Sequence, residues 1–231
     1  ALAFGKFQSL LADFPAETLH ETIADFHNTK ARFAVFKMAV EDDVMGRAKD
    51  VQDEINFVLQ REDVANILTD MQASGELPLR VTHNDTKLNN VLIDDKTHQG
   101  ICVIDLDTVM PGLAINDYGD SIRFGASTGA EDEKDLSKIE CSMHLMDVYT
   151  KGFIEGCNGR LTSAEIKALP IGAKVMTFEC GMRFLTDYLQ GDTYFKTKYP
   201  THNLDRCRTQ FKLVADMEKK WDTMNEIVAK Y

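Results

Sequence analysis

Residues 83–90 of this chain read HNDTKLNN, and residues 104–107 read IDLD. In the first segment an Asp follows the His by two residues, and Asn90 follows that Asp by five. This spacing matches the H-x-D-x-x-x-x-N pattern of kinase catalytic loops. In the second segment Asp105 ends an apolar run, where the metal-binding aspartate of a kinase stands. Together the two segments indicate a kinase-like fold and the chemistry of phosphoryl transfer.

The residue types in these segments suit that chemistry. A kinase needs a carboxylate that orients the attacking hydroxyl group and accepts its proton, and it needs oxygen ligands that hold Mg²⁺ against the phosphates of ATP. We expect Asp85 to be the catalytic carboxylate and Lys87 to offset charge on the transferred phosphoryl group. We expect Asn90 and Asp105 to bind the metal and, through it, ATP. The predicted cofactors are therefore Mg²⁺ and, as co-substrate, ATP.

A simpler interpretation is that these polar side chains only cap turns, as Asp and Asn often do. It explains one residue well and the combined spacing poorly. For His83 we predict a structural role, in which hydrogen bonds brace the loop, because a carboxylate two residues away is the better base. Either Asp107 acts at the metal site, as a second metal ligand or as a group that orients Asp105, or it is an exposed carboxylate of a turn.

The surrounding pattern predicts an α+β fold that is mostly helical, with a small β element carrying the catalytic and metal loops. Short strands are expected at residues 79–82, 91–93 and 101–104. Thr162 and Glu165 have the spacing of a capping box, which predicts a helix start. Helices are expected over residues 4–11, from Pro15 through Phe26, between 47 and 72, around 136–154, from 162 to about 189, and over 204–228.

The composition is that of a globular protein, with 44% hydrophobic and 27% charged residues over 231 positions. The formal net charge of −11 would repel a phosphate backbone, so we expect no nucleic acid partner. The five cysteines are odd in number and contain no Cys-x-x-Cys pair, which is typical of reduced thiols. No apolar run approaches the roughly 20 residues of a membrane span. We therefore expect a cytoplasmic protein with no membrane partner.

Three motifs resemble the aminoglycoside phosphotransferase and choline kinase superfamily. They are residues 83–92 (HNDTKLNNVL), 103–112 (VIDLDTVMPG) and 181–189 (GMRFLTDYL), and the similarity is closest to the bacterial N-acetylhexosamine 1-kinases. The first two motifs carry the kinase assignment, and the third carries most of the sugar assignment. The resemblance implies the C-terminal lobe of the protein-kinase fold. It also implies that an ATP-dependent enzyme phosphorylates a sugar, at the anomeric hydroxyl of an N-acetylhexosamine.

The chain departs from this family in one respect. It has 14 glycines, but none forms the glycine-rich phosphate loop of an N-terminal lobe, and no strand with a buried lysine precedes the first helices. We therefore expect that lobe to be absent and the chain alone to bind ATP weakly and to be inactive. Self-association through the face left by the missing lobe is a further expectation. Within residues 1–231 we expect a helical scaffold (1–77), the catalytic and metal loops (78–112) and a helical substrate-binding subdomain (113–231).

The resemblance also assigns substrate contacts to Asp85, Arg183 and Tyr194, with Asp187 nearby. An internal ion pair is the alternative role for Arg183, because a buried guanidinium needs a partner. Asp117 and Asp120 resemble the family's helix start after the metal motif, where carboxylates accept hydrogen bonds from amides of the catalytic loop. Choline, homoserine, aminoglycoside and methylthioribose kinases have the same loop, and a non-catalytic binding module is the rival from another class.

Overall fold

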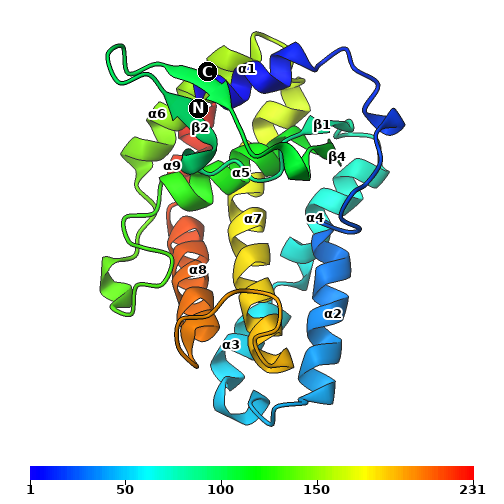
Figure 1. Cartoon of the computed structure of the whole chain (residues 1–231), viewed down its shortest axis with the longest axis vertical. Coiled ribbons are helices and arrows are strands. Elements are labelled where there is room, and N and C mark those ends of the chain that lie inside the picture. The colour runs from blue at the N-terminus through cyan, green and yellow to red at the C-terminus, as the bar shows by residue number, and fades with distance from the viewer.

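The longest helix, α7 (Ser163–Gln190), runs through the middle of the molecule in the computed structural model, which describes residues 1–231 (Figure 1). It begins at the capping box expected from the sequence. The Thr162 hydroxyl accepts the backbone N–H of Glu165 at 3.1 Å, and the Glu165 carboxylate accepts the backbone N–H of Thr162 at 2.7 Å. Most side chains of α7 are buried, so this helix forms the core on which the other helices pack.

Eight further α-helices surround α7, and Figure 1 shows α2 and α8 running beside it on opposite sides. Both chain ends lie against α6, because Ala1 packs on Gly152 and the side chain of Lys230 binds Asp147 at 3.2 Å. The helices are α1 (Leu2–Leu10), α2 (Thr29–Asp42), α3 (Gln52–Leu59), α4 (Glu62–Ala73), α5 (Ala114–Gly125), α6 (Met143–Cys157), α8 (His202–Lys219) and α9 (Trp221–Val228).

Helix α5 crosses α7 so closely that their backbones touch. A Cβ atom on Gly119 of α5 would collide with the carbonyl oxygen of Gly172 of α7, and a Cβ atom on Gly172 would lie 2.5 Å from the carbonyl oxygen of Ile115. Glycine at both positions allows this approach. The crossing fixes the first turns of α5 beneath the loop that contains residues 83–90.

Four short strands form two antiparallel pairs. Strand β1 (Arg80–Thr82) pairs with β4 (Met110–Gly112), and β2 (Val91–Ile93) pairs with β3 (Gly100–Val103). The three strands expected from the sequence are confirmed to within one or two residues, and β4 was not predicted. Residues 83–90 join β1 to β2, and residues 104–109 join β3 to β4. Each strand pair therefore holds one end of both connections.

The helix predicted from Pro15 through Phe26 is wrong. Only Ala16–Thr18 form a single 3₁₀ turn, and the rest of the segment is irregular. Polar side chains of this segment form hydrogen bonds with nearby backbone groups, as where the carboxylate of Glu21 accepts the N–H of Asp25 at 2.9 Å. Such local bonds compete with helical ones.

Three other helix boundaries also differ from the prediction. The expected helix of residues 47–72 is split at Gln60 and Arg61, so that α3 packs on α8 while α4 packs on α2 and α7. The last helix is split at Lys220 into α8 and α9. The segment 136–154 becomes helical only at Met143, where the side chain of Ser142 accepts the N–H of Leu145 at 3.3 Å. Helix α2 was not predicted.

None of the helices is both long enough and apolar enough to cross a lipid bilayer.

Candidate functional site

The catalytic loop, residues 83–90, is held from below by two carboxylates of α5. Asp117 accepts the backbone N–H groups of His83 and Asn84 at 2.9 and 2.7 Å, and Asp120 accepts that of Thr86 at 3.0 Å. The structural role expected for both aspartates is confirmed. Burial alone would raise the pKa of Asp120. The charges of Arg123 and His27 lower this pKa by more than burial raises it, so the pKa of the carboxyl group lies below its ordinary value.

His83 braces the loop from the other side. Its Nδ1 accepts the backbone N–H of Asp85 at 3.3 Å, and its Nε2 lies 2.9 Å from the carbonyl oxygen of Ile104. One partner is a donor and the other an acceptor, so these contacts assign the neutral tautomer with the proton on Nε2. His83 is fully buried and makes edge contacts with the rings of Phe4 and Phe7 on α1. The bracing role predicted for His83 is confirmed.

One carboxylate oxygen of Asp85 binds both Lys87 and Asn90. Oδ2 of Asp85 accepts Lys87 Nζ at 2.7 Å and Asn90 Nδ2 at 3.0 Å. Asn90 Nδ2 also donates to the Asp85 carbonyl oxygen at 2.8 Å. Oδ1 of Asp85 takes part in no hydrogen bond within the chain, so it is available to an acceptor molecule.

Asn90 and Asp105 are brought together by the pairing of β2 with β3. The Ile104 N–H donates to the Asn90 carbonyl at 2.9 Å, which extends the ladder to the residue directly before Asp105. Asp105 has a left-handed backbone, with φ of 64°, and its exposed carboxylate accepts no hydrogen bond. The Asn90 side-chain oxygen is also without a donor. Asp107 is exposed and unbonded, which leaves both interpretations of it open.

This donor set fits Mg²⁺ bound together with a nucleotide. Magnesium usually takes one or two protein oxygen ligands and completes its shell with phosphates and water. The chain contains no group of three or more His, Cys, Asp or Glu side chains able to hold a metal by themselves. Asn90 and Asp105 are the residues that would hold the ion, and their free oxygens are of the type that it prefers.

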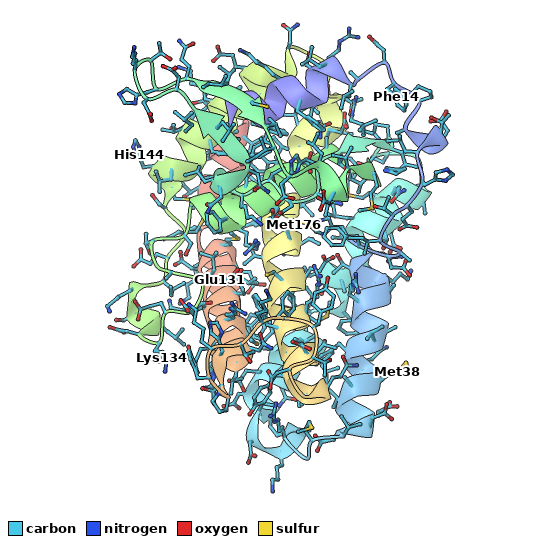
Figure 2. All side chains as sticks on the ribbon, in the orientation of Figure 1. Phe14, Met38, Glu131, Lys134, His144 and Met176 are labelled. Carbon is cyan, nitrogen blue, oxygen red and sulfur yellow. The ribbon has the colours of Figure 1, made fainter.

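A cavity of about 540 Å³ adjoins the catalytic loop, and Asp85, Lys87, Arg183 and Tyr194 all line it. The structure thus brings the predicted catalytic residues and the two additional predicted substrate contacts to one space. Met176 and Glu131, both labelled in Figure 2, line the cavity from α7 and from the segment between α5 and α6.

Arg183 lies among aromatic rings in this cavity. Its guanidinium carbon is 5.4 Å from the ring centre of Phe26 and 5.6 Å from those of Tyr194 and Phe195. Its only hydrogen bond within the chain is a long one, 3.4 Å, to the Tyr194 hydroxyl. The internal ion pair considered from the sequence is therefore wrong, because no carboxylate lies within 4.0 Å of this guanidinium.

Asp187, which the sequence placed near Arg183, forms hydrogen bonds with the loop of residues 193–195. Its carboxylate accepts the backbone N–H groups of Thr193, Tyr194 and Phe195 at 2.9, 2.8 and 3.0 Å, and the side-chain amide of Asn203 at 2.8 Å. Asp187 therefore fixes the loop that carries Tyr194 into the cavity wall.

Sequence reasoning missed several polar residues of the cavity, above all His27 and Glu179. Glu179 is only 1% exposed on α7, four residues before Arg183. Arg183 was predicted to be functional partly because it is a charged residue within an apolar helix face. The same criterion would have identified Glu179. No local signal singles out His27, because its partners lie far away in the sequence. The other charged residues missed are Arg123, Glu131, Lys196 and Arg206.

Two comparisons bear on this geometry. A profile described as the phosphotransferase enzyme family matches residues 13–140. The chain is also similar to a solved structure of a choline kinase from Cryptosporidium parvum Iowa II, with a TM-score of 0.62, 14% identity, and coverage of 100% of this chain and 68% of that one. At this identity the likeness concerns the fold, and the mostly helical, protein-kinase-like class expected from the sequence is confirmed.

Proposed function

Because the chain belongs to the phosphotransferase enzyme family, we propose that it is the catalytic part of a kinase that transfers the γ-phosphate of ATP to a sugar hydroxyl. The acceptor we propose is the anomeric hydroxyl of an N-acetylhexosamine. One observation carries this proposal: Asp85 and Lys87 line the same cavity as Arg183 and Tyr194. A carboxylate able to accept a proton thus adjoins groups able to bind neutral hydroxyls.

Each residue has a distinct part in the proposed reaction. Oδ1 of Asp85 accepts the hydrogen bond of the acceptor hydroxyl and takes its proton as the oxygen attacks phosphorus. Lys87, 2.7 Å from Oδ2, moves to offset charge on the transferred group. Asn90 and Asp105 would hold Mg²⁺, and the bound ion would supply positive charge that offsets that of the phosphates. The rate comes mainly from alignment in a site that excludes water, because a loose transition state needs little covalent chemistry.

The charge of the cavity favours a neutral acceptor. The acidic side chains Asp120 and Glu131 are paired with Arg123, and Glu179 is paired with His27. An aminoglycoside, which is a polycation, would need unpaired acidic groups here. Arg183 and Lys196, by contrast, belong to no ion pair and are free to donate to hydroxyl oxygens.

The aromatic residues argue against a choline acceptor. A quaternary ammonium ion binds the faces of several aromatic rings. Phe26, Tyr194 and Phe195 are arranged around the guanidinium of Arg183, with ring centres 5.4 to 5.6 Å away, so these rings already have a cation. The same guanidinium would repel a second cation. The resemblance of residues 181–189 to sugar kinases agrees with this argument.

The remaining ATP contacts are proposed to come from a separate N-terminal lobe. The chain has no glycine-rich phosphate loop, and a set of large apolar side chains is exposed around β2 and β3. They are Leu88 (63% exposed), Leu92 (49%), Ile93 (51%), Ile101 (66%) and Leu106 (53%). We infer that this surface contacts the ATP-binding lobe and that the chain self-associates through it when alone. A monomer at high concentration in sedimentation experiments would contradict the second inference.

The test is phosphorylation of a panel of acceptors by the full-length gene product with Mg²⁺ and ATP. The panel contains N-acetylhexosamines, neutral hexoses, choline, homoserine and an aminoglycoside. We expect N-acetylhexosamines to give the highest kcat/KM, and Arg183→Ala to raise KM for the sugar more than for ATP. A preference for choline or an aminoglycoside would overturn the sugar assignment. No transfer to any acceptor would favour a non-catalytic module.

A further inference from the structure

His27 connects three parts of the molecule that are distant in the sequence. It lies in the segment that joins α1 to α2, drawn in dark blue in Figure 1. Its Nδ1 is 2.8 Å from Oε1 of Glu179 on α7, and its Nε2 is 3.1 Å from the carbonyl oxygen of Asn84 in the catalytic loop. The side chain of His27 is 12% exposed, and that of Glu179 is 2% exposed.

The partners of His27 determine its protonation. A carbonyl oxygen accepts and never donates, and a carboxylate also only accepts. When Glu179 is ionised, both ring nitrogens of His27 face acceptors, and both contacts are hydrogen bonds only when both nitrogens carry a proton. The second oxygen of Glu179 accepts the Thr29 hydroxyl at 2.6 Å, as expected of an ionised carboxylate. The contacts thus assign an imidazolium to His27 and a carboxylate to Glu179.

The bond to Asn84 acts at a sharp turn of the catalytic loop. Asn84 has φ of 65°, a left-handed conformation that asparagine adopts more readily than most residues. The peptide bond after it leads directly to Asp85. His27 binds the carbonyl side of this peptide, and His83 accepts its N–H side at 3.3 Å. A cationic histidine and a neutral one therefore hold the same peptide from opposite ends.

We propose that His27 is a positioning residue, which as an imidazolium holds the Asn84–Asp85 peptide against α7 and so fixes the orientation of the Asp85 carboxylate. The proposal rests on the function proposed above for Asp85. When His27 loses a proton, one of its two bonds is lost, and the peptide is no longer tied to α7.

The charges around His27 support its protonated form. Burial lowers the pKa of His27, but the nearby carboxylate of Glu179, and to a smaller extent that of Asp120, raise it above its ordinary value of 6.5. Burial raises the pKa of Glu179, but His27 lowers it below its ordinary value of 4.5. Other charged groups line the two cavities that His27 also lines. The cations, which oppose the protonation of His27, are Lys30, Lys87, Arg123, Arg183, Lys196 and Arg206, with Arg32 of α2 near Glu179. The remaining acids are Glu17, Glu21, Asp25, Asp85 and Glu131.

Nuclear magnetic resonance of the imidazole nitrogens tests the protonation directly in the full chain. We expect His27 to carry protons on both nitrogens at pH 7, where a free imidazole with a pKa near 6.5 is mostly neutral. His83 should be neutral at the same pH, with its proton on Nε2. Glu179→Gln should lower the pKa of His27. A neutral His27 at pH 7, which would mean that Glu179 carries the proton, would overturn the proposal.

Kinetics of the full-length enzyme test the positioning role. His27→Gln keeps one donor and should lower kcat about tenfold, the effect of losing one charge-assisted hydrogen bond. KM for the sugar should change less than about twofold, because the sugar contacts remain. His20→Gln, at an exposed and unbonded histidine of the same segment, is the matched control and should match the wild type. Amide hydrogen exchange at Asp85 should be faster in His27→Gln only.

The outcomes separate the two proposals. A His27→Gln enzyme with unchanged kcat, or with KM and kcat changed in equal proportion, would overturn the positioning role. An inactive wild type would overturn the kinase proposal, while a doubly protonated His27 and faster exchange at Asp85 in His27→Gln would still support the tie between His27 and the loop.

Discussion

The catalytic loop and the metal segment, residues 105–107, differ in how completely their polar groups are bonded. In the loop, His83, Asn84, Thr86 and Asn90 are at most 4% exposed, and their N–H groups and side chains bind α5, the carbonyl oxygens of Ile104 and Thr108, or other residues of the loop. In the metal segment both carboxylates are exposed and accept no hydrogen bond. The part proposed to orient the acceptor is thus fixed by internal hydrogen bonds, whereas the part proposed to bind metal and nucleotide has free oxygen ligands.

The largest effect should come from removing the carboxylate beneath the loop. Asp117→Ala leaves two buried backbone N–H groups and the Gln8 amide, now 2.6 Å from Asp117, without an acceptor. We expect a loss of about 4 kcal/mol in the free energy of unfolding, because each unsatisfied buried donor is costly. Urea denaturation measures it. Asp95→Ala, at an exposed and unbonded aspartate, should lie within about 0.5 kcal/mol of the wild type.

The metal segment should behave in the opposite way. Asp105→Asn should lower activity more than about 100-fold. Loss of a residue that merely supports a metal ligand costs up to about 100-fold, and loss of the ligand itself should cost more. Its stability should not change, because Asp105 has no bond to lose and Asn adopts a left-handed backbone easily. Parallel assays of turnover against Mg²⁺ concentration and of urea denaturation check both parts. A large loss of stability would remove the contrast between the two segments.

Lys87 belongs to the catalytic loop but, like the metal segment, is exposed to solvent, and it should have an intermediate effect. Its ion pair with Asp85 is partly exposed, with side-chain exposures of 37% and 27%, so it adds little to stability. Lys87→Met should lower kcat about tenfold through loss of charge compensation. KM for the sugar should change little, and the urea midpoint should stay near that of the wild type. An unchanged kcat would show that Lys87 only screens Asp85.

The smallest effect should be a pH dependence of stability from His27 and Glu179. The pKa of His27 is raised, so its contribution is full below the pKa of the unfolded chain and is lost as pH rises through the folded pKa. The pKa of Glu179 is lowered, so its contribution is present above its unfolded pKa and is lost as pH falls through the folded one. The free energy of unfolding should therefore be highest at a pH between the ordinary pKa values of Glu179 and His27. The pair should add about 1 kcal/mol to it there.

Denaturation midpoints across this range provide the measurement. His27→Gln should flatten the alkaline side of the maximum, whereas His144→Gln, at an exposed histidine on α6, should not. Equal profiles for both variants would assign the pH dependence to other groups.

The motif residues were predictable because their geometry is local. Asp85, Lys87 and Asn90 lie within one short loop, and a single hairpin brings Asp105 to them, so spacing alone constrains their arrangement. The capping box of α7 was predictable for the same reason. The opposite wall of the cavity was not, since His27 and Glu179 are 152 positions apart and meet only through the packing of α2 on α7.

Helix boundaries failed where tertiary packing, rather than Gly or Pro, ends a helix. The breaks at Arg61 and Lys220 have helix-compatible sequences, and they are stabilised by distant partners: Arg61 binds Glu218 at 2.8 Å, and Lys220 binds the carbonyl of Cys141 at 3.1 Å. The segment from Ile23 to Phe26 was read as a helix because its apolar spacing is helical. These apolar side chains face the cavity instead of a core.

The central claim is that Asp85 accepts the proton of a sugar hydroxyl in the cavity that it shares with Arg183. Turnover of the full-length Asp85→Asn enzyme with Mg²⁺, ATP and an N-acetylhexosamine tests it most directly. We expect kcat to fall by roughly three orders of magnitude, with an unchanged urea midpoint, because the amide keeps the shape of the carboxylate and cannot take the proton. Near-normal turnover by a folded Asp85→Asn enzyme would contradict the account.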